Sequence, residues 1–461
     1  MTQKTLEESF PGEISARTAQ RAPLDKRDYT EPSTLAAEWE GIWTRCWLFA
    51  GLASDVPDSG DYFVYTLGRE SIVVLRDEQG DLRAFYNVCQ HRGNRIFTGE
   101  SGFVKQVACP YHGWRYALDG SLVEVPDAGR FCPPVDKDRR SLKPVQLALW
   151  AGTVWVNMDP LAPPLESYLG LIVGNLAPYH FENMVLAKHQ TVVLDANWKT
   201  VRDNFLEQYH VDFIHPQHAS FVDCCNSTNI LWPYGHSATM VEGYVTNARY
   251  PVPRHTPDHL VPLLQGLGLD PADFTGKVPK IRQAVQQRKR EVGNDLGFDY
   301  SGFTDAQVSD IWQYDIFPNT FMTIQAEEVW IYGPRPHPAD VDKCYFDKWT
   351  LQIPTEVGCD PARGLTLNPR LTASRDDARP PREVFTAADV IAGKHSLTIT
   401  LDQDIFYLAD MQAGMHSRGF DRAVLNEDEV RVQHFHDWVA YWLLATDDRA
   451  GGINRRGSPL L

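Results

Sequence analysis

Cys89-Gln-His91 and Cys109-Pro-Tyr-His112-Gly-Trp, separated by residues 92–108, decide how this chain is organised. Each stretch supplies one thiolate and one imidazole. Brought together as two facing loops, the stretches offer two sulfurs to one iron and two ring nitrogens to another. The spacing therefore predicts a [2Fe–2S] cluster with mixed Cys and His ligands.

The ligand types are those of a Rieske centre, in which two histidines replace two cysteines on one iron. Zinc is the ordinary alternative, because it also accepts two Cys and two His. Zinc fingers, however, place both cysteines before both histidines and carry the histidines on a helix, whereas the types alternate here. Gly93 and Gly113 follow the ligands, where we expect the backbone to come close to a cluster. The pattern favours the iron–sulfur interpretation over zinc or a chance arrangement.

The composition is that of a globular protein with more than one domain. The 461 residues include 43% hydrophobic and 23% charged residues, and the formal net charge is −16. This charge argues against binding to nucleic acid or to an anionic membrane surface. The N-terminus lacks the apolar region of a secretory signal, and the longest nearly apolar run, 145–158, is too short and too polar to span a bilayer. We therefore expect a cytoplasmic protein.

Eight cysteines in a chain of this length do not indicate a disulfide framework. Apart from the two expected cluster ligands, the cysteines show no metal-binding spacing. We interpret these six as buried or inert thiols: Cys46, Cys132, Cys224, Cys225, Cys344 and Cys359.

Changes in the sequence pattern divide the chain into three segments. Residues 1–46 are predicted to form a polar arm and a helix, extending over 35–47, that pack on the largest domain. Residues 47–160 contain short β-rich runs with turn signals between them, which predicts a small antiparallel β-domain with the cluster at the tips of two loops. Residues 161–461 alternate helical and strand patterns.

The expected fold class is therefore α+β. A small antiparallel β Rieske domain is joined to a larger domain with an antiparallel sheet flanked by helices. Two long polar sections of the larger domain, 251–310 and 355–392, are predicted to be surface insertions.

Residues 197–216 carry a second set of metal-ligand types. Glu207 and His210 are three residues apart, so both project from one side of a helix. Pro216 moves His215 out of the α region, so that His215 lies at or past the helix end and can turn back toward His210. Two neutral imidazoles and one carboxylate form the facial triad of non-haem Fe(II) oxygenases, which leaves positions open for O2 and substrate. The apolar face of this helix is predicted to contain Trp198, Val201, Phe205, Leu206 and Tyr209.

The third ligand is expected to be a carboxylate far downstream. Asp404 is the best candidate and Asp402 the alternative, since both precede an apolar helical run. Either is equally well explained as a helix-start carboxylate, and position alone does not separate them. A His-x4-His pair by itself is more often a hydrogen-bonded or surface pair than a metal site. The predicted cluster upstream favours iron, because electron delivery to an iron site explains both patterns together.

These motifs together resemble the large (α) subunits of Rieske non-haem iron aromatic-ring-hydroxylating oxygenases, over nearly the whole chain. The resemblance is carried by Asn-Val-Cys89-Gln-His91-Arg-Gly, Cys109-Pro-Tyr-His112-Gly-Trp, the segment 204–216, and Asp404 eight residues before Gln412. It implies a [2Fe–2S] cluster on Cys89, His91, Cys109 and His112, and a mononuclear Fe(II) on His210, His215 and Asp404.

The resemblance also implies how subunits cooperate. Members of the family form head-to-tail trimers, in which electrons cross to the neighbour's iron through a carboxylate between a cluster His and an iron His. Glu207 occupies that position, three residues before His210; the simpler interpretation of Glu207 is a solvated helix carboxylate. Glutamate at this position and the short spacing from Asn204 to His210 are similar to carnitine-type oxygenases. They favour an α3 homotrimer, with a small β subunit as the alternative.

The implied activity is that of a terminal oxygenase, a mono- or dioxygenase. It would hydroxylate, cis-dihydroxylate or oxidatively demethylate an aromatic or small organic substrate, as in aromatic hydrocarbon catabolism. NAD(P)H electrons are expected from a separate reductase, directly or through a ferredoxin, because the chain has no Gly-rich dinucleotide fingerprint. Phe205, Phe213 and residues 312–321 are expected to line the substrate pocket or, alternatively, to fill the core.

Two other functional classes remain open at this point. The first is a non-catalytic Rieske electron-transfer protein without a working mononuclear iron site. The second, less favoured, is a structural zinc protein, which would be colourless.

Overall fold

The computed structural model describes residues 13–14 and 23–450, with side chains described as far as Leu444. Much of the predicted N-terminal arm, residues 1–12 and 15–22, lies outside the described residues. Contacts divide the chain into two compact units. The smaller unit is Glu38–Tyr168, and the larger one combines the chain up to Ala37 with the chain from Leu169 onward.

The smaller unit consists of antiparallel β-sheets, as its alternating short runs predict. Its four-stranded sheet has the order β6-β5-β4-β7, and two three-stranded sheets have the orders β11-β12-β3 and β10-β9-β8. The strands are β3 (Leu48–Leu52), β4 (Asp61–Leu67), β5 (Glu70–Arg76), β6 (Leu82–Tyr86), β7 (Ser101–Phe103), β8 (Val107–Ala108), β9 (Arg115–Tyr116), β10 (Leu122–Glu124), β11 (Gln146–Trp150) and β12 (Thr153–Asn157).

The turn predicted between β5 and β6 shows how the local sequence sets this fold. Asp77 is fully buried, and its side chain accepts hydrogen bonds from the backbone N–H groups of Gln79 and Asp81. Gly80 has a φ of +88°, a conformation that other residues rarely adopt. An Asx-type turn closed by glycine therefore joins the two strands.

The larger unit is built on a nine-stranded sheet with the order β1-β14-β15-β16-β17-β18-β19-β13-β22. All neighbouring strands are antiparallel except β22, which pairs parallel with β13, so the sheet is mixed at one edge. These two units, one all-β and one with a sheet and helices, confirm the predicted α+β class. The strands are β1 (Glu13–Ile14), β13 (Val185–Leu194), β14 (Thr228–Leu231), β15 (Ser237–Val241), β16 (Ile311–Ile316), β17 (Thr320–Gln325), β18 (Glu328–Pro336), β19 (Cys344–Gln352) and β22 (Arg382–Thr386).

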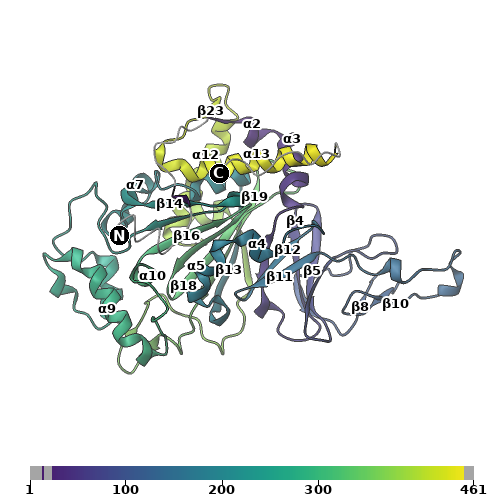
Figure 1. Ribbon diagram of the computed structural model, residues 1–461, viewed down its shortest axis with the longest axis horizontal. Helices are drawn as coiled ribbons and strands as arrows, with labels where there is room; N and C mark the ends of the chain where they lie inside the picture. Colours follow the sequence, from purple (N-terminus) through teal and green to yellow (C-terminus); the bar gives the residue numbers. More distant parts are fainter. Residues whose placement is uncertain (1–12, 15–22, 451–461) are drawn as a thin grey trace. The chain divides into compact units, whose positions relative to one another are not determined.

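Two helices cover neighbouring parts of this sheet. α6 (Trp198–Phe205) contacts β18, whereas α12 (Ile399–Met415) contacts β13 and also contacts α6. In Figure 1, α12 and the C-terminal helix α13 (Val430–Ala450) lie along one side of the large sheet. The strand between β18 and β13 is β19, which therefore runs beneath the seam between α6 and α12.

The helix predicted over 35–47 differs in its bounds. α3 covers Pro32–Glu38 and is followed by a π-helical turn, Trp39–Trp43. Gly41 and Thr44 are weak helix formers, and the N–H of Thr44 bonds to the carbonyl of Trp39, which widens the turn. The segment therefore continues as a helical turn up to Trp43, but the regular α-helix ends at Glu38, before the buried residues of that turn.

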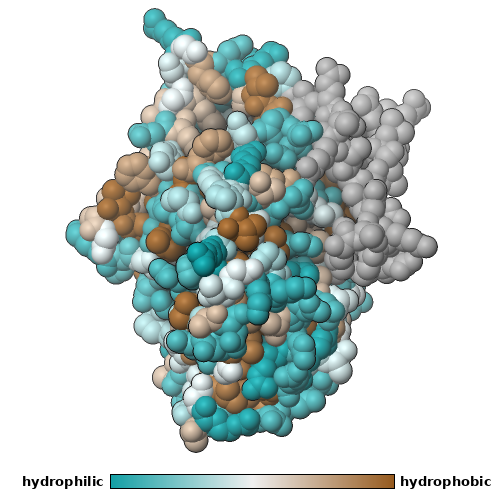
Figure 2. All heavy atoms as spheres, turned by 90° about the vertical axis from the view of Figure 1, so that its left-hand side faces the viewer, coloured by the Kyte–Doolittle hydropathy of each residue, from teal (hydrophilic) through white to brown (hydrophobic). Residues whose placement is uncertain are grey.

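The surface is mostly hydrophilic on the face drawn in Figure 2, where hydrophobic side chains form only small separate groups. Within the described residues, no helix has the length and apolar character needed to cross a bilayer. Both observations agree with the strongly acidic composition.

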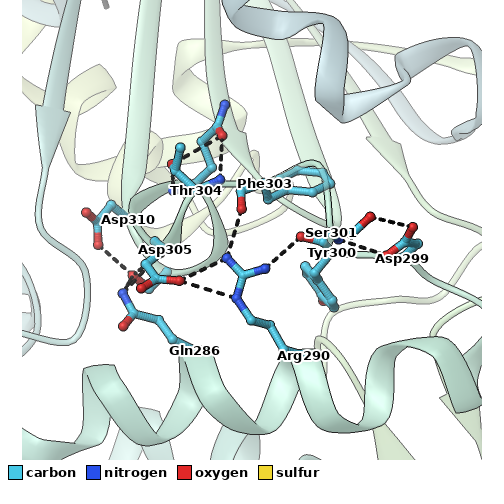
Figure 3. A network of polar contacts seen from close by, with 11 residues as sticks. Gln286, Arg290, Asp299, Tyr300, Ser301, Phe303, Thr304, Asp305 and Asp310 are labelled. Carbon is cyan, nitrogen blue, oxygen red and sulfur yellow. Dashed lines mark hydrogen bonds and ion pairs between the residues drawn. The ribbon is translucent and has the colours of Figure 1, made fainter. Parts of the chain in front are cut away.

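The section 251–310 is more ordered than a surface insertion. It contains α8 (Val261–Gly266), α9 (Ile281–Gly293) and α10 (Asp305–Ser309). Figure 3 shows Arg290 of α9 at the centre of a polar network: its guanidinium donates to the carbonyls of Tyr300 (2.7 Å) and Phe303 (2.8 Å) and to Asp305 Oδ1 (2.9 Å). The section also has buried hydrophobic side chains, among them Leu264, Ile281 and Val285, so it is packed as well as hydrogen-bonded.

Candidate functional site

The two Cys/His loops have the same backbone geometry. The N–H of Cys89 bonds to the carbonyl of Asn94, and the N–H of Cys109 bonds to the carbonyl of Trp114, both at 2.8 Å. In each loop a glycine N–H, four residues after the cysteine, bonds back to the cysteine carbonyl at 3.0 Å. These glycines, Gly93 and Gly113, have φ values of +78° and +70°. Residues other than glycine rarely adopt such φ values, which accounts for glycine at both positions.

The four predicted cluster ligands lie together at these loops. Cys89 and Cys109 are buried, and the ring centroids of His91 and His112 are 4.6 Å apart. His91 Nδ1 is buried without a hydrogen-bond partner among the described residues, which suits an atom that ligates a metal. The Tyr116 hydroxyl is 3.3 Å from Cys89 Sγ and accepts the N–H of Gln90, so it is placed to bond to a cluster sulfur.

The geometry of these donors also separates iron–sulfur from zinc. Among the described residues, one group of three or more His, Cys, Asp or Glu donors has its atoms within 4.8 Å of one another, and it does not include the cluster loops. The two cysteines and two histidines therefore do not converge on one point, as tetrahedral zinc requires. A two-iron cluster, which spreads its ligands over two metals, fits them better.

The group that does converge is His210, His215 and Asp404. His215 Nε2 is 3.1 Å and His210 Nε2 is 3.5 Å from Asp404 Oδ1. His215 and Asp404 are 1% and 2% exposed, whereas His210 is partly accessible. Two imidazoles and one carboxylate thus face a common point, although the carboxylate lies 189 positions after His215 in the chain. They fit a facially coordinated Fe(II) with open positions.

Glu207 reaches His210 from a tight turn and not from a continuous helix. α6 begins with Asn197, whose side chain accepts the N–H of Lys199, and it ends at Phe205. Beyond that end, Glu207 Oε2 accepts the backbone N–H of His210 at 3.1 Å, and Glu207 Oε1 contacts His210 Nδ1. The predicted proximity of Glu207 and His210 is therefore present, and the turn, rather than a helical face, produces it.

Gln403 holds the second imidazole in the corresponding way. His215 Nδ1 is 2.7 Å from Gln403 Oε1, which also accepts a bond from Gln217 Nε2 at 2.8 Å. Because an amide oxygen can only accept, His215 carries its proton on Nδ1 and directs the lone pair of Nε2 toward Asp404. Gln403 was not predicted, because its place directly before Asp404 does not by itself distinguish it from any other surface glutamine.

The structure distinguishes the two candidate aspartates by position. Asp402 accepts bonds from Ser396 Oγ (2.5 Å) and from the N–H of Leu397 (2.9 Å), so it closes the turn before α12. Asp404, one half-turn later, is buried beside the two histidines. The carboxylate that meets His210 and His215 is therefore that of Asp404.

Gln412 ties the two halves of the site together. Its Oε1 accepts bonds from the N–H of Asn197 (3.0 Å) and from the hydroxyl of Thr200 (2.8 Å), at the start of α6. Its Nε2 donates to Asp342 Oδ1 at 2.6 Å. Through this buried amide, the helix that carries Asp404 is fixed against the helix that leads to His210.

The electrostatics of the site favour a cation. Burial disfavours the imidazolium form of His210, but the contact with Glu207 and the charges of Glu207 and Asp404 outweigh burial and raise the pKa of His210. Two carboxylates thus surround the imidazoles in a largely buried site. A divalent metal ion supplies the positive charge that this arrangement stabilises.

Two aromatic residues do not lie where the sequence analysis expected them. Tyr209, predicted on the buried face, is 47% exposed, and Phe213, predicted in the pocket, is 69% exposed. Tyr209 follows the early end of α6, so the helical spacing on which its prediction rested does not extend to it, and Phe213 lies in the separate short helix α7 (Val211–Ile214). Phe205 is buried and its ring contacts Tyr332 (5.4 Å) and Phe346 (5.5 Å).

Two family models match this chain. Residues 181–445 match the ring hydroxylating alpha subunit (catalytic domain), and residues 46–144 match the Rieske [2Fe–2S] domain. The chain is also similar to the glycine betaine monooxygenase oxygenase subunit of Chromohalobacter salexigens, with 36% identity over 41% of this chain and 42% of that protein. It is 35% identical to the carnitine monooxygenase oxygenase subunit of Escherichia coli over 45% of this chain and 56% of that protein. The matched part thus spans about half the length of these relatives.

Solved structures show the same fold at low sequence identity. A quaternary ammonium Rieske monooxygenase in complex with L-carnitine superimposes with a TM-score of 0.64 and 20% identity, covering 93% of this chain and 99% of that one. Naphthalene 1,2-dioxygenase with bound indole gives a TM-score of 0.64 and 20% identity, covering 95% and 97%. At this identity the likeness establishes the fold and not the substrate.

Proposed function

Because the chain belongs to the ring hydroxylating alpha subunit family, we propose that it is the terminal oxygenase of a Rieske non-haem iron oxygenase system. It uses O2 to hydroxylate, cis-dihydroxylate or oxidatively demethylate an aromatic or small organic substrate. NAD(P)H electrons reach it from a separate reductase, directly or through a ferredoxin. The observation that carries this proposal is the convergence of His210, His215 and Asp404, in a chain whose earlier Cys/His pattern matches the Rieske domain.

Each metal group has a defined set of residues in this proposal. Cys89, His91, Cys109 and His112 hold the [2Fe–2S] cluster, and His210, His215 and Asp404 hold the mononuclear Fe(II). When bound, these groups supply one-electron transfer and O2 activation.

The side chains around the ligands prepare the site for that chemistry. Glu207 and Gln403 each occupy the Nδ1 side of one histidine, so both Nε2 lone pairs are available on the Asp404 side. Glu207 also remains partly accessible next to His210, and we propose that it couples this histidine to a cluster histidine of a neighbouring subunit.

The assembly follows from the same proposal. We infer a cytoplasmic α3 homotrimer, with a small β subunit as the alternative, and a role in catabolism of aromatic or related compounds. The domain division that goes with it assigns residues 1–46 to an N-terminal arm and helix, 47–160 to the Rieske domain and 161–461 to the catalytic domain.

Iron analysis and oxygen uptake test this function together. The anaerobically purified protein should contain about three irons per chain, two of them with acid-labile sulfide. With NADH and a suitable reductase, it should consume O2 in a substrate-dependent manner. About two irons and no substrate-dependent uptake across a broad substrate panel would instead support the non-catalytic electron-transfer protein.

A further inference from the structure

A buried lysine lies on the sheet face that the two site helices cover. In β19, Phe346 contacts Phe205 of α6, and two residues later Lys348 points to the same face of the sheet. Lys348 pairs in register with Tyr332 of β18 on one side and with Gln190 of β13 on the other. Since α6 covers β18 and α12 covers β13, Lys348 lies beneath the seam between the helices that lead to His210 and carry Asp404.

The ammonium group of Lys348 lacks an anionic partner. The residue is 2% exposed, its Nζ donates to Thr350 Oγ1 at 2.8 Å, and it lies 4.8 Å from the ring centroid of Trp330. Within the part of the chain that the structure describes, no carboxylate lies within ion-pair distance of this Nζ. A lysine ammonium has three donors, and one hydroxyl satisfies only one of them. A buried charge in this state is costly unless a ligand completes its pairing.

The neighbouring Gln190 has a complementary unused atom. Its Nε2 donates to Glu383 Oε2 (2.9 Å) and to the carbonyl of Ser396 (3.1 Å), just before α12. Both partners are acceptors, so the orientation of the amide is determined. Its Oε1 is buried and has no hydrogen-bond partner among the described residues. The pair thus presents unused donors on Lys348 and an unused acceptor on Gln190, side by side.

We propose that Lys348 binds the carboxylate of the substrate and that Gln190 accepts a hydrogen bond from a neighbouring hydroxyl or amino group. The substrate class is then a small organic acid, not a neutral hydrocarbon. This inference rests on the proposed oxygenase function and deepens it. With its acid group held at β19, the rest of the substrate extends past Tyr332 toward the point shared by His210, His215 and Asp404.

The charge of Lys348 adds a pH signature. Burial lowers the pKa of Lys348 to about 8, and the charged groups that act on it are Glu328 of β18, Asp402 of α12, Lys188 of β13 and Arg370. Carboxylate affinity should therefore be constant near neutral pH and fall by up to about tenfold per unit above pH 8.

Equilibrium binding to the iron-loaded full chain tests the proposal. Salicylate, benzoate and phenol are titrated calorimetrically at pH 7, and the expected order of affinity is salicylate, then benzoate, then phenol. K348M should weaken binding of both carboxylates at least tenfold and leave phenol unchanged, whereas K348R should retain most of the affinity. Q190L should remove the advantage of salicylate over benzoate. K280M, at an exposed lysine that does not act on Lys348, is the matched control and should bind like the wild type.

Two results would overturn this inference. One is that neither carboxylate binds the wild type more tightly than phenol; the other is that K348M, with unchanged iron content and melting temperature, binds the carboxylates normally. In either case, substrate-dependent O2 uptake with a neutral compound would leave the oxygenase function intact. Conversely, carboxylate binding that depends on Lys348 in a protein with only two irons would support the anion site and reject the oxygenase.

Discussion

At the scale of single residues, the metal site depends on side chains that do not themselves bind metal. Glu207 and Gln403 each hold the Nδ1 of one histidine, and the Nε2 atoms consequently face Asp404. The sequence predicted Glu207 because it lies three residues before His210. It did not predict Gln403, because a glutamine beside an aspartate has no distinguishing pattern until the fold brings His215 next to it.

Replacing Glu207 by Gln should abolish turnover and leave both metal groups in place. The amide can still contact His210 Nδ1, but it carries no charge to stabilise or transfer a proton. Iron content and the visible spectrum should match the wild type, while substrate-dependent O2 uptake should fall at least 100-fold. E166Q, at an exposed glutamate, is the control. Normal coupled activity in E207Q would remove Glu207 from the mechanism.

Replacing Gln403 by Leu should weaken iron binding. Without the acceptor at Nδ1, the ring of His215 is free to change its tautomer and orientation, which we expect to cost about 10- to 100-fold in metal affinity. Titration of the metal-free protein with Co(II), followed by its visible absorption, measures this directly. Q403E keeps an acceptor and should bind nearly normally; an unchanged affinity in Q403L would show that the contact with His215 Nδ1 does not support the metal site.

At the scale of elements, the site is assembled by contacts between helices that are distant in sequence. Gln412 of α12 is 2% exposed and accepts two bonds from the first turn of α6. Neither contact is visible in the sequence, although both helices are predictable from their own patterns. The pairing of the helices is what converts two separate motifs into one site.

Substituting Gln412 by Leu should destabilise the larger unit and lower its iron occupancy. The buried N–H of Asn197 and the buried hydroxyl of Thr200 would lose their acceptor, at a cost of about 1–3 kcal/mol for each unsatisfied group. Urea unfolding of the metal-free protein gives the free energy of unfolding. M411A, at a 44% exposed position of the same helix, should change it by less than about 1 kcal/mol.

The helical section around α9 depends on a buried ion pair. Lys289 Nζ is 2.9 Å from Glu327 Oε1, and both side chains are at most 3% exposed. E327Q should cost about 3–5 kcal/mol of stability, because it leaves the ammonium without its counter-charge. The exposed pair Arg288–Glu291 is the matched control, and E291Q should leave the free energy of unfolding essentially unchanged because solvent screens this pair. A small effect of E327Q would show that hydrogen bonds from the ammonium to neutral groups are enough to keep it buried.

At the scale of the whole molecule, the smaller unit carries the cluster-ligand loops and the larger unit carries the His210–His215–Asp404 group. The cores of the two units follow from different sequence patterns. The smaller unit has strands at the runs predicted from alternation, and its core includes the two cluster cysteines with Trp114 and Tyr116. The larger unit gathers strands from between Glu13 and Thr386 into one sheet, and β22 joins it in parallel from a section that the sequence predicts to be an insertion. Local patterns identify strands well, but they carry little information on such long-range pairing.

The acid stability of the larger unit should depend on His189. Burial lowers the pKa of His189 from 6.5 to about 3, and its ring stacks on Trp349 at 4.5 Å. In the unfolded chain this histidine is therefore protonated as the pH falls below about 6.5. In the folded chain it stays neutral until the pH approaches 3. Stability from this residue is retained above pH 6.5 and falls as the pH decreases, by up to about 1.4 kcal/mol per unit.

Urea unfolding at pH 6.5 and 5.5 checks this dependence. H189F keeps the stacking and should lose less stability between the two values than the wild type, whereas H255F, at an exposed histidine, should follow the wild type. Equal losses in H189F and the wild type would show that His189 has no part in the acid sensitivity.

The sequence alone determined the donor sets and the fold class. Residue type and local spacing decide which side chains can ligate a metal, and short-range periodicity decides whether a segment becomes a strand or a helix. Only the tertiary structure decided between Asp404 and Asp402, placed Gln403 behind His215, and set Lys348 beneath the seam of α6 and α12. These relations join residues separated by up to about 200 positions, and their geometry follows from packing of the complete chain. The physical reason is that ligand chemistry belongs to individual side chains, whereas convergence on a common point belongs to the folded molecule.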